Sequence, residues 1–81
     1  MTLEEKVIGI IMEQLDVTQE ECVPEASFLD DLGADSLDLV ELIMAMEETF
    51  AIQIADNELQ QIRSIKDVLD YLRNKGVTWH E

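Results

Sequence analysis

The sequence predicts an all-α fold, a small bundle of three main helices plus one short helix, with a long loop between the first and second helices. Apolar residues recur at three- to four-residue spacing in three separate stretches, which is the period of an amphipathic helix. Hydrophobic residues make up 47% of the 81-residue chain and are spread along it, so its high charge does not indicate disorder. This length suits one small domain over residues 1–81.

The first helix is expected over residues 3–15, with Thr2 as its cap. Its apolar stripe consists of Leu3, Val7, Ile10, Ile11 and Leu15. Residues 17–35 keep no helical period and contain Pro24 and Gly33, so they are expected to form the long loop. Ser27 with Asp30 can cap a short turn there. The residues expected to pin the loop to the core are Phe28, Leu29 and Leu32.

The second helix, expected over residues 36–50, has two apolar stripes. One stripe, suited to the core, comprises Leu39, Leu42, Ile43, Met46 and Phe50. The other comprises Leu37, Val40 and Met44, and it is bordered by Glu41, Glu47 and Glu48. A domain this small cannot easily bury both stripes, so the second stripe favours a surface for a partner.

The last third of the chain predicts two more helices after the extended stretch "AIQIA". Asp56 is expected to cap a brief helix that carries Leu59 and Ile62. Ser64 and Asp67 form a capping box for the last helix. That helix has Ile65, Val68, Leu69 and Leu72 at helical spacing, Lys75 near its end and Gly76 as its terminator. Residues 76–81 are expected to fray.

The charge distribution limits the classes of partner. Nineteen acids against five bases give a net charge of −14, and no Lys or Arg occurs between Lys6 and Arg63. Such a surface opposes binding to nucleic acid or anionic lipid, so partners are expected to be basic. An ordinary solubilising surface is the alternative explanation. No apolar run approaches membrane-spanning length, so no membrane insertion is expected, and the like charge argues for a monomer.

A single cysteine, Cys22, cannot form an internal disulfide, which suits a reducing, cytoplasmic location. Its neighbours Glu20 and Glu21 supply no base to stabilise a thiolate, so no role is assigned to it. The N-terminal segment has neither the apolar core of a secretory signal nor an Arg-rich transit pattern.

Ser36 stands between Asp35 and Asp38 at the expected start of the second helix. Asp35 or Ser36 could simply cap the helix. A hydrolytic role is disfavoured because the only histidine, His80, lies in the tail and no G-x-S-x-G motif is present. A calcium loop over residues 30–41 lacks the required glycine and ligands. A helix N-terminus does favour phosphate, which a serine there could carry as an ester.

The stretch "FLDDLGADSLDLVELIMAMEETF", residues 28–50, resembles the signature of the acyl carrier proteins of dissociated bacterial fatty acid synthesis, and a weaker resemblance extends from Leu3 to Leu72. It implies that Ser36, flanked by Asp35 and Leu37, receives 4'-phosphopantetheine from coenzyme A through a phosphopantetheinyl transferase, the holo-carrier synthase. The thiol of that arm would carry acyl groups as thioesters. The protein would have no catalytic activity of its own and no resident metal.

The resemblance also implies that the second helix recognises fatty acid synthesis enzymes through their apolar and Arg/Lys-rich docking patches. The residues implied in that contact are Asp35, Leu37, Asp38, Val40, Glu41, Met44, Glu47 and Glu48. The core would open to shelter the acyl chain. The residues implied in that core are Leu3, Val7, Ile11, Phe28, Ile54, Ile62, Val68 and Leu72.

Some positions depart from the commonest pattern of the family: Leu39 stands where a small hydroxyl residue is frequent, and Ala55 where proline is frequent. Cys22 and Trp79 are also atypical. A specialised carrier for a polyketide, a nonribosomal peptide or another acyl pathway is therefore an alternative. From a different class, an acidic interaction protein that inhibits a basic enzyme would explain the charge but not the D-S-L motif.

Overall fold

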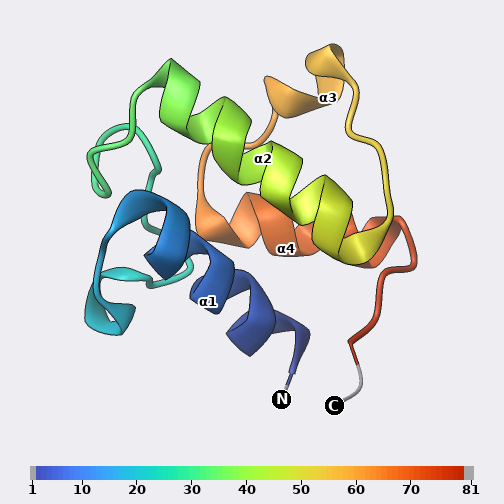
Figure 1. The fold of residues 1–81 in the computed structure, drawn as a ribbon, viewed down its shortest axis with the longest axis horizontal. Coiled ribbons are helices and arrows are strands. Elements are labelled where there is room, and N and C mark those ends of the chain that lie inside the picture. The colour runs from blue at the N-terminus through green and yellow to red at the C-terminus, as the bar shows by residue number, and fades with distance from the viewer. Residues whose placement is uncertain (1, 80–81) are drawn as a thin grey trace.

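The structure, a computed structural model, describes residues 2–79 as a helical bundle (Figure 1). The elements in chain order are α1 (Leu3–Leu15), the 3-10 turn η1 (Gln19–Glu21), α2 (Ser36–Phe50), α3 (Asp56–Leu59) and α4 (Ile65–Asn74). Within residues 2–79 no strand forms, and the extended pairing consists of an isolated antiparallel bridge between Ser27 and Ser64. The predicted all-α bundle, with one short helix and a long loop before α2, is confirmed.

Local capping explains where the main helices begin. The side chain of Thr2 accepts a hydrogen bond from the Glu5 N–H at 3.1 Å, as expected for α1. At α3 the expected cap is wrong: Ala55 occupies the cap position in extended conformation, and Asp56 is the first helical residue. The Glu58 carboxylate accepts a hydrogen bond from the Ala55 N–H at 3.4 Å. A side chain within the helix therefore stabilises the start of α3.

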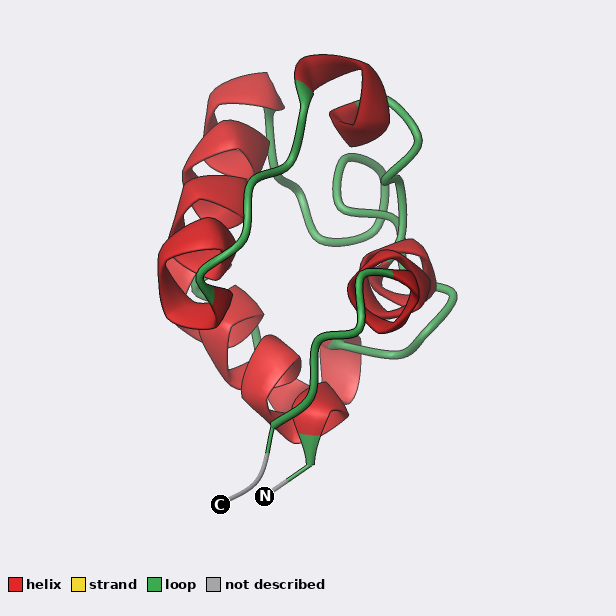
Figure 2. Ribbon diagram, turned by 90° about the vertical axis from the view of Figure 1, so that its right-hand side faces the viewer, coloured by secondary structure: helices red, strands yellow, loops and turns green. Residues whose placement is uncertain are grey.

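The core lies between α1, α2 and α4, which surround it when the molecule is viewed along α4 (Figure 2). Each long helix turns its apolar stripe inward, and the fully buried side chains include Val7, Ile11, Phe28, Leu42, Met46, Ile65, Val68 and Leu72. Of the eight core residues named from the sequence, Leu3 and Ile54 are only partly buried, and the other six are buried. Both exceptions sit where the chain enters or leaves a helix.

The loop before α2 is attached to the core by Phe28 and Leu32, as predicted. The prediction for Leu29 is wrong, because this side chain is 52% exposed. The reason is the backbone: the Phe28 N–H donates to the Arg63 carbonyl at 3.0 Å, which turns Phe28 inward and leaves its neighbour outside. The Asp30 N–H donates to the Ser27 hydroxyl at 3.3 Å, so the expected turn cap is present.

The chain after α4, for which fraying is predicted, contacts the helices as far as residue 79. Gly76 has a φ of +78°, which glycine adopts readily, and the Val77 N–H then donates to the Leu72 carbonyl at 2.9 Å. Trp79 packs edge-on against Phe50, with ring centroids 5.8 Å apart. The Lys6 ammonium lies 4.9 Å from the centre of the Trp79 ring. The rest of the tail, residues 80 and 81, lies outside the described residues.

Candidate functional site

At the start of α2, the structure shows which of Asp35 and Ser36 caps the helix. Asp35 is the cap: its backbone is extended, and its carboxylate accepts the Asp38 N–H at 2.8 Å. The Asp38 carboxylate accepts the Asp35 N–H in return, at 3.3 Å. Ser36 is the first helical residue and is exposed, and its hydroxyl has no hydrogen-bond partner within residues 2–79. The serine is therefore available for chemistry without cost to the helix start.

Around Ser36 the backbone offers donors suited to a phosphate group. The first intrahelical bond runs from the Leu39 N–H to the Asp35 carbonyl at 3.0 Å, so the N–H groups of Ser36 and Leu37 precede the hydrogen-bonded ladder. Free amides and the positive end of the helix dipole both stabilise phosphate. Asp35 and Asp38 would repel an unattached anion, so this environment fits a phosphate held covalently on the serine.

The outer face of α2, defined as Leu37, Val40 and Met44, is open to solvent. These side chains are 66%, 41% and 60% exposed, respectively. The inner stripe supplies Leu42, Ile43 and Met46 to the core, and Leu39 and Phe50 are half-buried at its ends. The predicted division of α2 into a buried and an exposed apolar stripe is confirmed.

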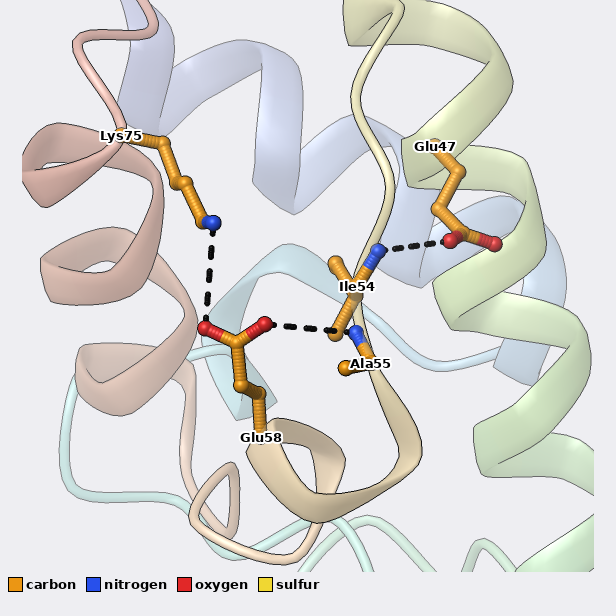
Figure 3. Close-up of polar contacts among 5 residues, drawn as sticks. All are labelled: Glu47, Ile54, Ala55, Glu58 and Lys75. Carbon is orange, nitrogen blue, oxygen red and sulfur yellow. Dashed lines mark hydrogen bonds and ion pairs between the residues drawn. The ribbon is translucent and has the colours of Figure 1, made fainter.

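Acidic residues border this outer face to different degrees. Asp35, Glu41 and Glu48 are exposed, and Asp38 is half-buried beside its capping partner. Glu47 is also half-buried, and its Oε2 atom accepts the Ile54 N–H at 2.7 Å (Figure 3). Its carboxylate therefore anchors the segment that follows α2, a use that the sequence did not indicate.

The short helix α3 is held by polar contacts of Glu58. One carboxylate oxygen accepts the Ala55 N–H, and the other lies 3.8 Å from the Lys75 ammonium, next to the end of α4 (Figure 3). Burial first, and then the neighbouring Glu58 carboxylate, raise the pKa of the Tyr71 hydroxyl, and the Lys75 ammonium opposes this rise. Since an exposed ion pair contributes little stability, the contact with Lys75 adds little to the attachment of α3.

A cavity of about 280 Å³ lies between the loop before α2, the first turn of α2 and α3. Its apolar lining is formed by Phe28, Leu29, Leu39, Leu59 and Ile62. Its polar lining is formed by Ser27, Asp30, Gln60 and Arg63. The sequence did not predict this cavity, because its walls come from three separate segments of the chain. The only sequence feature that pointed to it was the pair of apolar residues Leu59 and Ile62.

The Cys22 side chain is buried and free. Burial, with a further contribution from the Glu21 carboxylate, raises the pKa of its thiol. The reactive thiolate form is therefore disfavoured in the folded state.

None of the helices within residues 2–79 is both long and apolar enough to cross a membrane. Over the same range, no group of three or more His, Cys, Asp or Glu side chains is arranged to hold a metal ion.

Comparison with known proteins identifies the family. The model of the family described as "Phosphopantetheine attachment site" matches residues 5–72. The "Acyl carrier protein" of Syntrophus aciditrophicus (strain SB) is 63% identical over 79 residues, which cover 98% of this chain and 99% of the relative. The "Acyl carrier protein" of Nitratidesulfovibrio vulgaris (strain DP4) is 61% identical over 75 residues, 93% of this chain and 99% of the relative. The chain belongs to the acyl carrier protein family, in which the cofactor is 4'-phosphopantetheine.

Proposed function

We propose that Ser36 is the attachment point of the phosphopantetheine arm. The observation that carries this proposal is the exposed Ser36 hydroxyl, which has no hydrogen-bond partner within residues 2–79 and stands beside a cap that Asp35 already supplies. In the reaction, the Ser36 oxygen loses its proton and forms a phosphodiester with the arm, and adenosine 3',5'-bisphosphate leaves from coenzyme A. The Ser36 and Leu37 amides, which precede the first intrahelical hydrogen bond, would be available to stabilise the new phosphate.

Once attached, the arm supplies a thiol that carries acyl groups as thioesters. The protein's own residues position the arm and present it to other proteins, and we assign them no catalytic step. Residues 1–81 would form a single carrier domain, working in the cytoplasm as a monomer. Its cargo would be the acyl intermediates of fatty acid synthesis, with a polyketide or other acyl pathway as the alternative.

The docking surface for partner enzymes would be the outer face of α2 with its acidic border. Leu37, Val40 and Met44 offer exposed apolar contacts of the kind that anchor a small interface. The border, Asp35, Asp38, Glu41 and Glu48, would steer basic patches of the phosphopantetheinyl transferase and of the synthesis enzymes. Glu47 would contribute less than the sequence implied, because its carboxylate is bonded to the Ile54 N–H.

The test is the intact mass of the protein after incubation with coenzyme A, magnesium and a phosphopantetheinyl transferase. We expect the mass of one phosphopantetheine to be added to the wild type and to Ser64→Ala, whose serine also stands at a helix start. The Ser36→Ala variant should gain nothing. If several transferases leave the wild type unmodified, the proposal fails, and inhibition of a basic enzyme becomes the better explanation of the charge.

A further inference from the structure

The basic residues divide into two groups by their contacts. The Lys75 ammonium lies 3.8 Å from the Glu58 carboxylate, and the Lys6 ammonium lies over the Trp79 ring. The other three bases are exposed, and within residues 2–79 none of them forms an ion pair or a cation–π contact. They are Arg63, Lys66 and Arg73. In a chain with nineteen acids, their positive charge is therefore not cancelled by a local contact.

These three bases, called here the α4 stripe, lie along the outer side of α4 and the turn before it. Lys66 and Arg73 are seven residues apart, about two helical turns, so they share one face of α4. Asp70 is the exposed acid between them. The Asp67 carboxylate is bonded instead to two N–H groups at the start of the helix, at 3.1 and 3.2 Å. The three bases outweigh Asp70 and leave this face positive.

The α4 stripe lies across the molecule from the outer face of α2. Figure 2 shows α2 and α4 on opposite sides of the core, and α1 packs against both. Both helices turn their apolar residues inward, so their outer sides point away from each other. The exposed charges that border the outer face of α2 are all acidic: Asp35, Glu41 and Glu48. The carrier therefore has a negative side on α2 and a positive stripe on the opposite side.

We infer that the α4 stripe repels the basic patches of partner enzymes and so restricts their docking to the α2 side of the carrier. The net charge of −14 attracts a basic enzyme from a distance but does not select a face. An enzyme docked on α4 would sit across the core from α2, the helix that presents Ser36. The inference rests on the proposed function, from which it takes the basic patches. Arg63, Lys66 and Arg73 are in this sense specificity-determining residues for the orientation of docking.

The test locates the docked enzyme on the carrier by limited carbodiimide labelling of carboxylates, followed by mass spectrometry. The carrier is mixed with a phosphopantetheinyl transferase without coenzyme A, at an ionic strength of about 0.01 M, where the Debye length is about 30 Å. In the wild type, the enzyme should slow the labelling of Glu41 and Glu48 and leave that of Asp70 unchanged. In Lys66→Gln with Arg73→Gln, it should also slow the labelling of Asp70, by at least about twofold, because the negative net charge then attracts the enzyme to this side as well.

The matched control is Gln14→Glu with Gln19→Glu, which changes two exposed side chains on α1 and η1. It makes the net charge as negative as the α4 double variant does, but it leaves the α4 stripe intact. Asp70 should therefore be labelled at the same rate with and without the enzyme. Each rate is compared with that of the same variant without enzyme, so direct effects of the substitutions on labelling cancel. At about 1 M salt, where the Debye length is about 3 Å, the slower labelling of Asp70 in the α4 double variant should disappear.

Intact mass after incubation with coenzyme A and the transferase separates failure of the proposed function from failure of this inference. A wild type that takes up no arm refutes the proposed function itself. If the arm attaches normally, labelling of Asp70 that the enzyme does not slow in the α4 double variant would overturn only the inference about the α4 stripe. Slower labelling of Asp70 in the wild type or in the control would overturn it as well. Lys66→Gln alone tests the same face, should the double variant fail to fold.

Discussion

The starts of α2 and α4 use the same hydrogen-bonding box but place a serine differently within it. At α4 the serine is itself the cap: the Ser64 hydroxyl accepts the Asp67 N–H at 3.3 Å, and the Asp67 carboxylate accepts the Ser64 N–H at 3.2 Å. At α2 an aspartate, Asp35, takes the cap position, and Ser36 follows it. A displacement of one residue thus separates a serine that caps its helix from one that does not.

The surroundings of the two serines differ as well. Ser64 is half-buried and pairs with Ser27 in the bridge between the loop and α4. Ser36 is exposed and follows a loop in which Gly33 has a φ of +70°. In the proposed function, a phosphate ester on Ser36 would leave the cap of α2 intact, because Asp35 supplies that cap.

The strongest test of this comparison exchanges the two residues at the start of α2. In the double variant Asp35→Ser and Ser36→Asp, the serine becomes the cap, displaced by about 1.5 Å along the helix and rotated by about 100°. We expect the rate of modification by a phosphopantetheinyl transferase to fall by at least about 100-fold, since reactions of this kind are sensitive to displacements of this size. The rate is measured by intact mass over time, with circular dichroism to verify that α2 remains folded. Modification at the wild-type rate would show that the position within the box is unimportant.

A second test compares the stability of two single variants. Ser64→Ala removes a cap and should lower the free energy of unfolding by about 1 kcal/mol. Ser36→Ala removes no hydrogen bond within the described residues, and alanine is a good helix former, so its effect should stay within about 0.5 kcal/mol. Urea denaturation of both variants gives the two values directly. Equal losses would mean that the Ser36 hydroxyl also contributes to folding.

The smallest expected effect concerns the charges around the two helix starts. Arg63 and Lys66 flank Ser64, whereas acids alone border Ser36. Raising the ionic strength from about 0.01 M to about 0.1 M shortens the Debye length from about 30 Å to about 10 Å, which weakens the repulsion within a domain of net charge −14. We expect the melting temperature to rise by a few degrees, and millimolar divalent cations to act in the same direction. Amide hydrogen exchange should slow more in the first turn of α2 than in the first turn of α4. A melting temperature that does not change with ionic strength would show that the repulsion between the carboxylates is already compensated at low salt.

The features that the sequence predicted correctly depend on contacts within a few residues. The caps of α1 and α4 join residues three positions apart, and the two stripes of α2 follow from the helical period alone. The resemblance of residues 28–50 to a known signature located the candidate serine. That Asp35 and not Ser36 caps α2 required the structure, because both residue types are good caps.

The predictions that proved wrong, and the features that were missed, depend on distant contacts. The exposure of Leu29 follows from a bond between Phe28 and Arg63, thirty-five residues apart in sequence. The contacts of Trp79 with Phe50 and Lys6 join residues that are at least twenty-nine positions apart in the sequence. The cavity combines three segments that no local pattern relates, so its volume and lining could come only from the packed structure.

The position of Trp79 makes the protein its own optical probe. It is the only tryptophan in the chain, and its indole ring packs on Phe50, the last residue of α2. The 15 residues of α2 place that ring roughly 20 Å along the helix axis from Ser36. The fluorescence emission of Trp79 can therefore be used to follow unfolding, and no fluorescent label has to be placed near Ser36. A change in emission on loading would mean that attachment at one end of α2 is felt at the other.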